Sequence, residues 1–285
     1  MSSAENRFRR GCTKNSTPGA PSPIGGVSIP VKFRCLLFPA LPLLAAAAPF
    51  TAIGDGEKLT YKVGFAIFSH AGDITIAGES ETAGGRDLAR VTVDTRSRGI
   101  VRGLYEFDSK AEAVIDRPTG RLLSVHETGA DPKRPIDNDF KIDYEKRRAT
   151  YTDRVRTGRS GELPLPEGGD PLDLISALVQ TREWNLKPGE KRDIVVQFAR
   201  DFYAISIHAE GYEEVRTPMG RYKTLVLVPR MEKDPKGLFK RGGEIKVWIA
   251  QDDTRLPVKM QLKLRFGSAT LSLSGYQKAA AVAAK

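Results

Sequence analysis

Apolar and polar residues alternate along most of this chain with a period of two. The clearest case lies near the C-terminus, where five apolar residues alternate with four polar ones over 258–266. This period predicts a β-strand with one buried face. The pair Gly267-Ser268 predicts a tight turn, and the alternation resumes over 270–274. We therefore expect residues 258–274 to form a β-hairpin.

The same alternation recurs upstream, and turn-forming residues separate the alternating segments. The predicted strands cover residues 59–68, 74–82, 89–95, 105–115, 122–128, 140–144, 149–155, 193–198, 203–209, 222–228 and 244–250. Short strands at this spacing, with few helices between them, are typical of an antiparallel sheet that curls on itself. The sequence predicts a mainly β fold, either a curved antiparallel sheet or a partly closed β-barrel.

One segment, at about 170–184, has the pattern of an α-helix instead. Asp170 can cap the helix, Pro171 suits the first helical position, and an apolar stripe that includes Leu178 follows at helical spacing. We expect this principal helix to pack on the concave face of the sheet or to close one end of it. The alternative is that its stripe lines a ligand cavity.

Residues 31–47 have the layout of a secretory signal peptide. Lys32 and Arg34 precede an uncharged apolar run. The run is interrupted by two prolines and is shorter than the roughly 20 apolar residues of a membrane span. We expect cleavage after Ala47, so that no transmembrane span remains, and a mature protein in the periplasm, with secretion as the alternative.

The segment ahead of the signal peptide, residues 1–30, is rich in Ser, Pro and Gly and shows no hydrophobic periodicity. It is either a disordered leader or an over-extended gene start. Both cysteines, Cys12 and Cys35, precede the expected cleavage point. The mature part, residues 48–285, is then expected to be a single β-rich domain with no disulfide and no thiolate metal site.

The net charge of the chain is modest once the first 47 residues are removed. They hold six of the Lys and Arg residues and one acidic residue, so cleavage halves the formal net charge from +10 to +5. The remaining basic residues are interspersed with acidic ones, which argues against nucleic-acid binding. The densest basic cluster includes Lys236, Lys240 and Arg241 beside a Pro/Gly-rich loop. Peripheral contact with anionic lipid or polysaccharide is one interpretation, and an ordinary basic loop is the other.

Four segments together resemble the bacterial domain of unknown function 3108. They are GEKLTYKV at 56–63, DPLD at 170–173, TPMGRYKT at 217–224 and VWIAQDDTRLPV at 247–258. The resemblance covers residues 56–275. It implies an exported, β-rich protein of Gram-negative envelopes, and it supplies no catalytic residues.

The strongest polar constellation is Asp252, Asp253 and Arg255, at the end of a predicted strand. Two carboxylates beside an arginine can perform acid/base chemistry if one is buried. The simpler interpretation is a turn in which the aspartates accept backbone hydrogen bonds. The three histidines are far apart in sequence, and nucleotide and hydrolase motifs are absent, so we predict no metal site and no cofactor.

These observations favour a non-enzymatic envelope protein that binds a hydrophobic ligand or an envelope partner on a curved sheet. Leu178, Trp184, Tyr222 and Trp248 are the candidates for a cavity wall, with core packing as the alternative. Two other functions stay open: a hydrolase of envelope glycan or lipid that uses Asp252 and Asp253, and an outer-membrane assembly factor.

Overall fold

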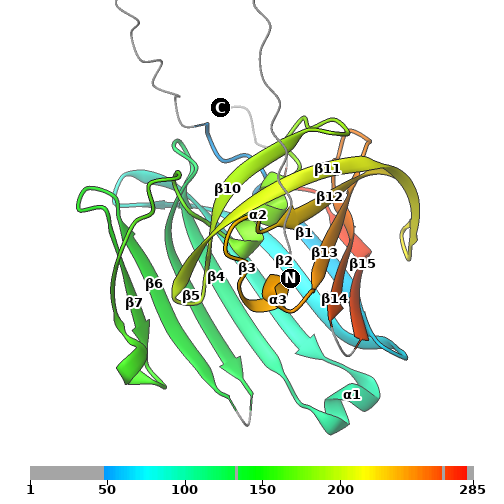
Figure 1. The fold of residues 1–285 in the computed structure, drawn as a ribbon, viewed down its shortest axis with the longest axis horizontal. Coiled ribbons are helices and arrows are strands. Elements are labelled where there is room, and N and C mark those ends of the chain that lie inside the picture. The colour runs from blue at the N-terminus through cyan, green and yellow to red at the C-terminus, as the bar shows by residue number, and fades with distance from the viewer. Residues whose placement is uncertain (1–47, 132–133, 265–266, 281–285) are drawn as a thin grey trace, which may run out of the picture. The chain divides into compact units, whose positions relative to one another are not determined.

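A computed structural model describes residues 48–131, 134–264 and 267–280 of the chain (Figure 1). These residues belong to one compact unit, Ala46–Lys285. The predicted leader and signal peptide, residues 1–30 and 31–47, lie outside the described residues.

The unit is built around one sheet of 15 strands. The first series of strands is β1 (Lys58–Phe65), β2 (Phe68–Ala83), β3 (Arg86–Ser97), β4 (Asp108–Asp116), β5 (Arg121–Ala130), β6 (Ile136–Asp143), β7 (Arg148–Asp153) and β8 (Gly161–Pro164). The second series is β9 (Leu172–Asp173), β10 (Lys191–Phe198), β11 (Asp201–Thr217), β12 (Gly220–Arg230), β13 (Glu244–Ala250), β14 (Pro257–Leu264) and β15 (Gly267–Gln277). Short helices interrupt them: α1 (Gly99–Leu104), the 3-10 turn Thr157–Arg159, α2 (Leu174–Gln180) and α3 (Gly237–Lys240).

Strand order shows that the sheet curves without closing. From one edge to the other the order is β8 to β1, then β15 down to β9, so β1 and β15 pair in the middle. The pairs are antiparallel except for β9 with β10. The predicted mainly β fold with a curved antiparallel sheet is confirmed. The predicted C-terminal hairpin forms from β14 and β15, although Gly267 begins β15 rather than the turn.

The helix is shorter than its sequence pattern predicts. It begins at Leu174 rather than near Asp170, because Asp173 is the N-cap and accepts hydrogen bonds from the amides of Ile175 and Ser176. Asp170 instead forms an ion pair with Arg121 at 2.8 Å. α2 lies inside the curve of the sheet, between β10 and β3 (Figure 1).

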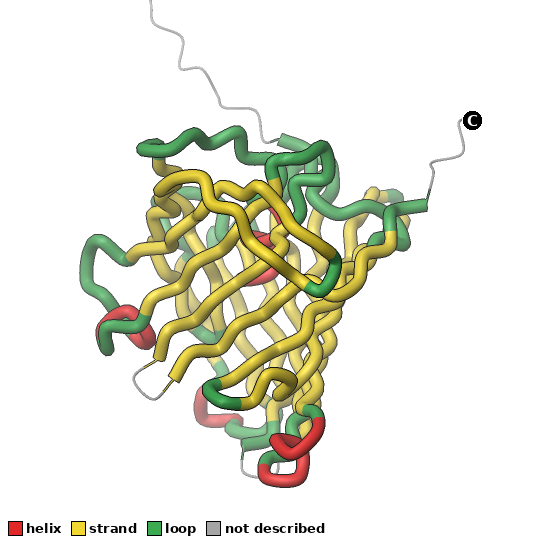
Figure 2. Tube along the Cα trace, turned by 90° about the vertical axis from the view of Figure 1, so that its right-hand side faces the viewer, coloured by secondary structure: helices red, strands yellow, loops and turns green. Residues whose placement is uncertain are grey.

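The β11–β12 hairpin adds a layer on the outside of the sheet. It crosses in front of neighbouring strands in Figure 2, and β11 contacts β14 and β15. A β-bulge between Ala209 and Tyr212 allows the hairpin to bend. Because of this cover, Val226 and Trp248 are buried on the outer face of the sheet.

Candidate functional site

One end of the curved sheet is filled by the chain itself. Phe50, Ala52 and Ile53 precede β1 and are each no more than 2% exposed. They belong to the same hydrophobic core as Val179 of α2 and the buried Trp184. We call the segments 48–57, 181–184 and 251–256 together the closed end.

Arg182 connects the parts of the closed end. Its guanidinium lies 2.9 Å from Glu57 Oε1; the Glu57 side chain is buried and that of Arg182 is half-buried. It also donates hydrogen bonds to the carbonyl oxygens of Ala52, at 2.7 Å, and Thr254, at 3.2 Å. Tyr276 donates to the same Glu57 carboxylate at 2.8 Å. This cluster has no signal in the sequence, because no periodic pattern marks Arg182 or Glu57.

The predicted polar constellation lies in the β13–β14 turn at the closed end. The Asp252 carboxylate accepts hydrogen bonds from the amides of Thr254 and Arg255, at 3.0 and 3.2 Å, and the Asp253 side chain is exposed. Arg255 does not pair with either aspartate. Its guanidinium donates to the carbonyl oxygens of Arg182 and Trp184, at 3.0 and 2.9 Å. The arrangement ties the turn to the chain that follows α2.

The aromatic candidates for a cavity wall are distributed over different surfaces. Trp184 is buried at the closed end beneath the Arg192 guanidinium, 4.9 Å from the ring centroid. Trp248 lies under the β11–β12 hairpin on the outer face, where its Nε1 donates to Glu213 at 2.8 Å. Tyr222 is half-buried on that hairpin, and Leu178 is half-buried on α2.

The concave surface changes from one end of the sheet to the other. Near the closed end, five strands each place a fully buried apolar side chain on this face: Leu59, Ile76, Ile249, Val258 and Leu273. Toward the opposite end, the same strands carry apolar side chains that are only half-buried: Val63, Ile74, Ile245, Leu262 and Leu271. We call the second set the open-end patch.

Strand pairing holds the open-end patch together. Val63 of β1 pairs with Leu271 of β15, and Ile245 of β13 pairs with Leu262 of β14. Ile74 of β2 pairs with Tyr61, a buried residue that precedes Val63 by two positions on β1. These pairings place the five apolar side chains on one face of β2, β1, β15, β14 and β13. This surface can bind an apolar molecule.

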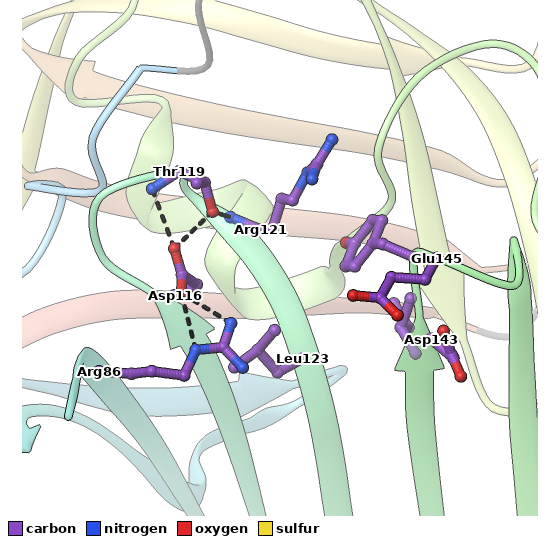
Figure 3. Close-up of a pocket in the computed structure, with 9 residues that line it drawn as sticks. Arg86, Asp116, Thr119, Arg121, Leu123, Asp143 and Glu145 are labelled. Atoms are coloured by element: carbon purple, nitrogen blue, oxygen red, sulfur yellow. Dashed lines mark hydrogen bonds and ion pairs between the residues drawn. The ribbon is translucent and has the colours of Figure 1, made fainter. Parts of the chain in front are cut away.

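A polar hollow of about 430 Å³ lies at the ends of β3, β4, β5 and β6 (Figure 3). Asp116 accepts hydrogen bonds from Thr119 and from Arg86, the latter at 2.8 Å. Arg121 lies 4.7 Å from the centroid of the Tyr144 ring and pairs with Asp170. Asp116 is thus paired with Arg86 and Arg121 with Asp170, whereas the Glu145 carboxylate, which also lines the hollow, has no ion-pair partner among the described residues.

Burial shifts the pKa of groups next to the closed end. The pKa of the Tyr61 phenol is raised by burial, and its hydroxyl donates to the carbonyl of Pro257 at 2.8 Å. Burial also raises the pKa of Asp173, against the hydrogen bonds from Ser176 and Ile175. Both groups have structural partners, so these shifts reflect burial within the core.

The basic candidates lie in the β12–β13 connection, where Lys236, Lys240 and Arg241 are exposed. The histidines each contact a different carboxylate: His70 contacts Asp73, His126 contacts Asp139 and His208 contacts Glu232. Within the described ranges, no group of three His, Cys, Asp or Glu side chains is placed to hold a metal ion. No helix in the described part of the chain has the length and apolar character needed to cross a membrane.

Comparison with solved structures supports the fold. A beta-barrel-like protein of domain of unknown function DUF1849 from Brucella abortus has a TM-score of 0.53 and 9% sequence identity, covering 80% of this chain and 99% of that one. A protein with a YmcC-like fold from Bacteroides fragilis has a TM-score of only 0.32 and 8% identity, covering 81% and 100%. No curated protein matches the sequence.

The family described as protein of unknown function (DUF3108) matches residues 60–274, which is most of the chain. The match includes the strands that carry the open-end patch, the helix α2 and the β13–β14 turn. The resemblance seen in the sequence is thereby confirmed, and the chain belongs to the DUF3108 family.

Proposed function

We propose that this protein is an exported, non-enzymatic binding protein of the periplasm that holds a hydrophobic ligand against its concave surface. The observation that carries the proposal is the open-end patch. Export is supported by the signal-peptide pattern of residues 31–47. The ligand class that fits is a molecule with an extended apolar part, such as an acyl chain.

The patch has the chemistry of a binding surface rather than of a finished core. Leu59 and Leu273, deeper on the same strands, are fully buried, so the concave face is covered at the closed end. Val63 and Leu271 have the same orientation on β1 and β15 but are only half-buried. Covering apolar surface contributes roughly 25 cal/mol per Å². An acyl chain along these strands would gain this free energy.

The hydrolase alternative has less support. The Asp252 carboxylate accepts turn hydrogen bonds, the Asp253 side chain is exposed, and the Arg255 guanidinium bonds to main-chain carbonyls. None of these groups belongs to the open-end patch. If the protein were a hydrolase, the double variant Asp252→Asn with Asp253→Asn would fail to restore the phenotype of a strain that lacks the gene. The proposal predicts that this double variant restores the phenotype fully.

A fluorescent fatty-acid analogue, titrated into the purified protein, tests the proposal. The double variant Leu262→Gln with Leu271→Gln is expected to bind the probe about tenfold more weakly, since it removes apolar contact at two positions. The matched control is Lys263→Gln with Ser272→Gln, which changes neighbouring residues on the opposite face of the same strands. Equal binding by both folded double variants would contradict the proposal.

A further inference from the structure

Five connections between consecutive strands lie wholly within the described residues at the end of the sheet opposite the closed end. They are the β1–β2, β3–β4, β7–β8, β10–β11 and β12–β13 connections, residues 66–67, 98–107, 154–160, 199–200 and 231–243. We call these five segments the open rim. In Figure 1, α1 and α3 mark two of them. The antiparallel order of the strands places them all at one end.

Exposed apolar side chains concentrate at this end. Nine large hydrophobic residues are exposed among those that the structure describes. Six of them are in the open rim or directly beside it: Ile67, Ile100, Leu104, Tyr105, Val155 and Phe198. Ile67 is 90% exposed and Leu104 is 77% exposed. Such side chains in water indicate a surface that is covered when the protein acts.

The open rim is also strongly basic. Its five segments contain ten Lys and Arg residues and three acidic ones. The connections at the other end, residues 84–85, 117–120, 144–147, 218–219 and 251–256, contain four basic and three acidic residues. Four of the ten cations pair with acidic residues at or beside the rim, namely Arg98, Arg102, Arg154 and Arg156, so the positive excess of this end rests on the other six.

Several of these cations are available to a partner. Within the described part of the chain, Lys233, Lys236, Lys240 and Arg241 form no ion pair. Of the two acidic residues in this connection, Glu232 turns back to the sheet and pairs with Lys191 at 3.2 Å, and Asp234 forms no ion pair with another described residue. The four cations of the β12–β13 connection thus outnumber its two acidic residues, and none of the four is held in an ion pair by the residues that the structure describes.

We propose that the open rim docks on the surface of an anionic lipid bilayer. Exposed apolar side chains beside unpaired cations match the interface of such a bilayer, where acyl chains lie beneath negative headgroups. A soluble polyanion would use the cations but would leave Ile67, Ile100 and Leu104 in water. The inference rests on the rim and does not depend on the ligand proposal. If both hold, the open-end patch faces the bilayer.

Vesicle co-sedimentation tests the docking surface. Vesicles of phosphatidylglycerol and phosphatidylcholine in equal parts are expected to carry the protein into the pellet, and vesicles of phosphatidylcholine alone are not. Binding is expected to weaken as salt is raised to about 1 M, where screening acts within roughly 3 Å. Equal binding to both kinds of vesicle, or no binding to either, would overturn the proposal.

Charge reversal at each end separates a rim effect from a net-charge effect. The triple variant Lys236→Glu, Lys240→Glu and Arg241→Glu is expected to lower the vesicle affinity at least about tenfold. The control triple, Lys187→Glu, Arg216→Glu and Lys223→Glu, makes the same change of charge on exposed residues toward the other end. Equal losses in the two triples would contradict a localised docking surface.

The apolar part of the rim has its own test. Ile67→Ser with Ile100→Ser is expected to reduce vesicle binding several-fold, while Met219→Ser, at the exposed tip of the β11–β12 hairpin, leaves it unchanged. Circular dichroism checks that each variant is folded. If the apolar variant binds vesicles as the unmodified protein does, the rim recognises a polyanion and the bilayer proposal fails.

Discussion

Arg182 and Glu57, 125 positions apart in the chain, form an ion pair of 2.9 Å whose side chains are only 14% and 5% exposed. The pair joins the chain after α2 to the segment that enters β1. Arg182 also bonds to Ala52 in the same entering segment and to Thr254 in the β13–β14 turn. The closed end is therefore built from parts that are distant in sequence, and the apolar concave face is covered there.

Breaking this pair is expected to destabilise the fold strongly. Arg182→Met leaves the Glu57 carboxylate buried without its cation, which costs roughly 3–5 kcal/mol of unfolding free energy. The control is Arg148→Met, because the Arg148–Glu162 pair is exposed and such pairs contribute at most about 1 kcal/mol. Urea unfolding measures both. Similar losses in the two variants would contradict the role given to Arg182.

The β13–β14 turn is expected to respond as a structural element. Arg255→Asn removes the bonds to the carbonyls of Arg182 and Trp184 and should cost about 2–3 kcal/mol. Arg255 has a φ of 46°. Asparagine is chosen because it tolerates this left-handed backbone conformation. Asp252→Ala should cost about 1 kcal/mol, and Asp253→Ala should lie within about 0.5 kcal/mol of zero. Thermal unfolding of the three variants checks this order, and a loss at Asp253 as large as at Asp252 would contradict it.

Gly78 lies where the segment before β1 crosses β2. A Cβ at this position would lie 2.7 Å from the Gly54 carbonyl oxygen and 2.8 Å from Ile53 Cγ1. Gly78→Ala is therefore expected to destabilise the protein by roughly 1–3 kcal/mol. Gly211→Ala, where a Cβ meets nothing within 4 Å, is the control for the same substitution. If chemical unfolding gives the two variants the same free energy of unfolding, the segment 48–57 does not pack against Gly78.

The contribution of Asp116 to the free energy of unfolding is expected to decrease at acid pH. Hydrogen bonding by the Thr119 side chain, together with Arg86, holds the pKa of this carboxyl below its ordinary value. A lowered folded-state pKa contributes stability above the unfolded value of about 3.9, and this stability is lost as pH falls through the folded value. Unfolding free energies of the unmodified protein and Asp116→Asn should therefore converge between about pH 5 and pH 2. A constant difference over this interval would contradict the assignment.

Local patterns in the sequence were sufficient to predict most of the strands, although β8 and β9 were not among them. Alternation over residues 258–264 defined β14, because each of its faces has one kind of environment. The helix was predicted too long, since Asp170 and Pro171 have the composition of a helix start but Leu172 and Asp173 pair with β10. That pairing is a tertiary contact and leaves no local signal.

The site was less accessible to sequence analysis than the fold. Trp248 belongs to a strand with both faces buried, and only the fold of the β11–β12 hairpin over β13 shows which face it occupies. Leu273 is buried and Leu271 is half-buried. This difference in burial arises from the segments that fill the closed end. No periodicity distinguishes these two residues.

The central claim is that an apolar ligand lies on the open-end patch, and methyl NMR with a spin-labelled fatty acid tests it most directly. We predict that addition of the fatty acid broadens the methyl signals of Ile245, Leu262 and Leu271. The signals of Ile249 and Leu273, which are fully buried toward the closed end, should be broadened less. Equal broadening of both groups, or broadening confined to residues outside the concave face, would contradict the account.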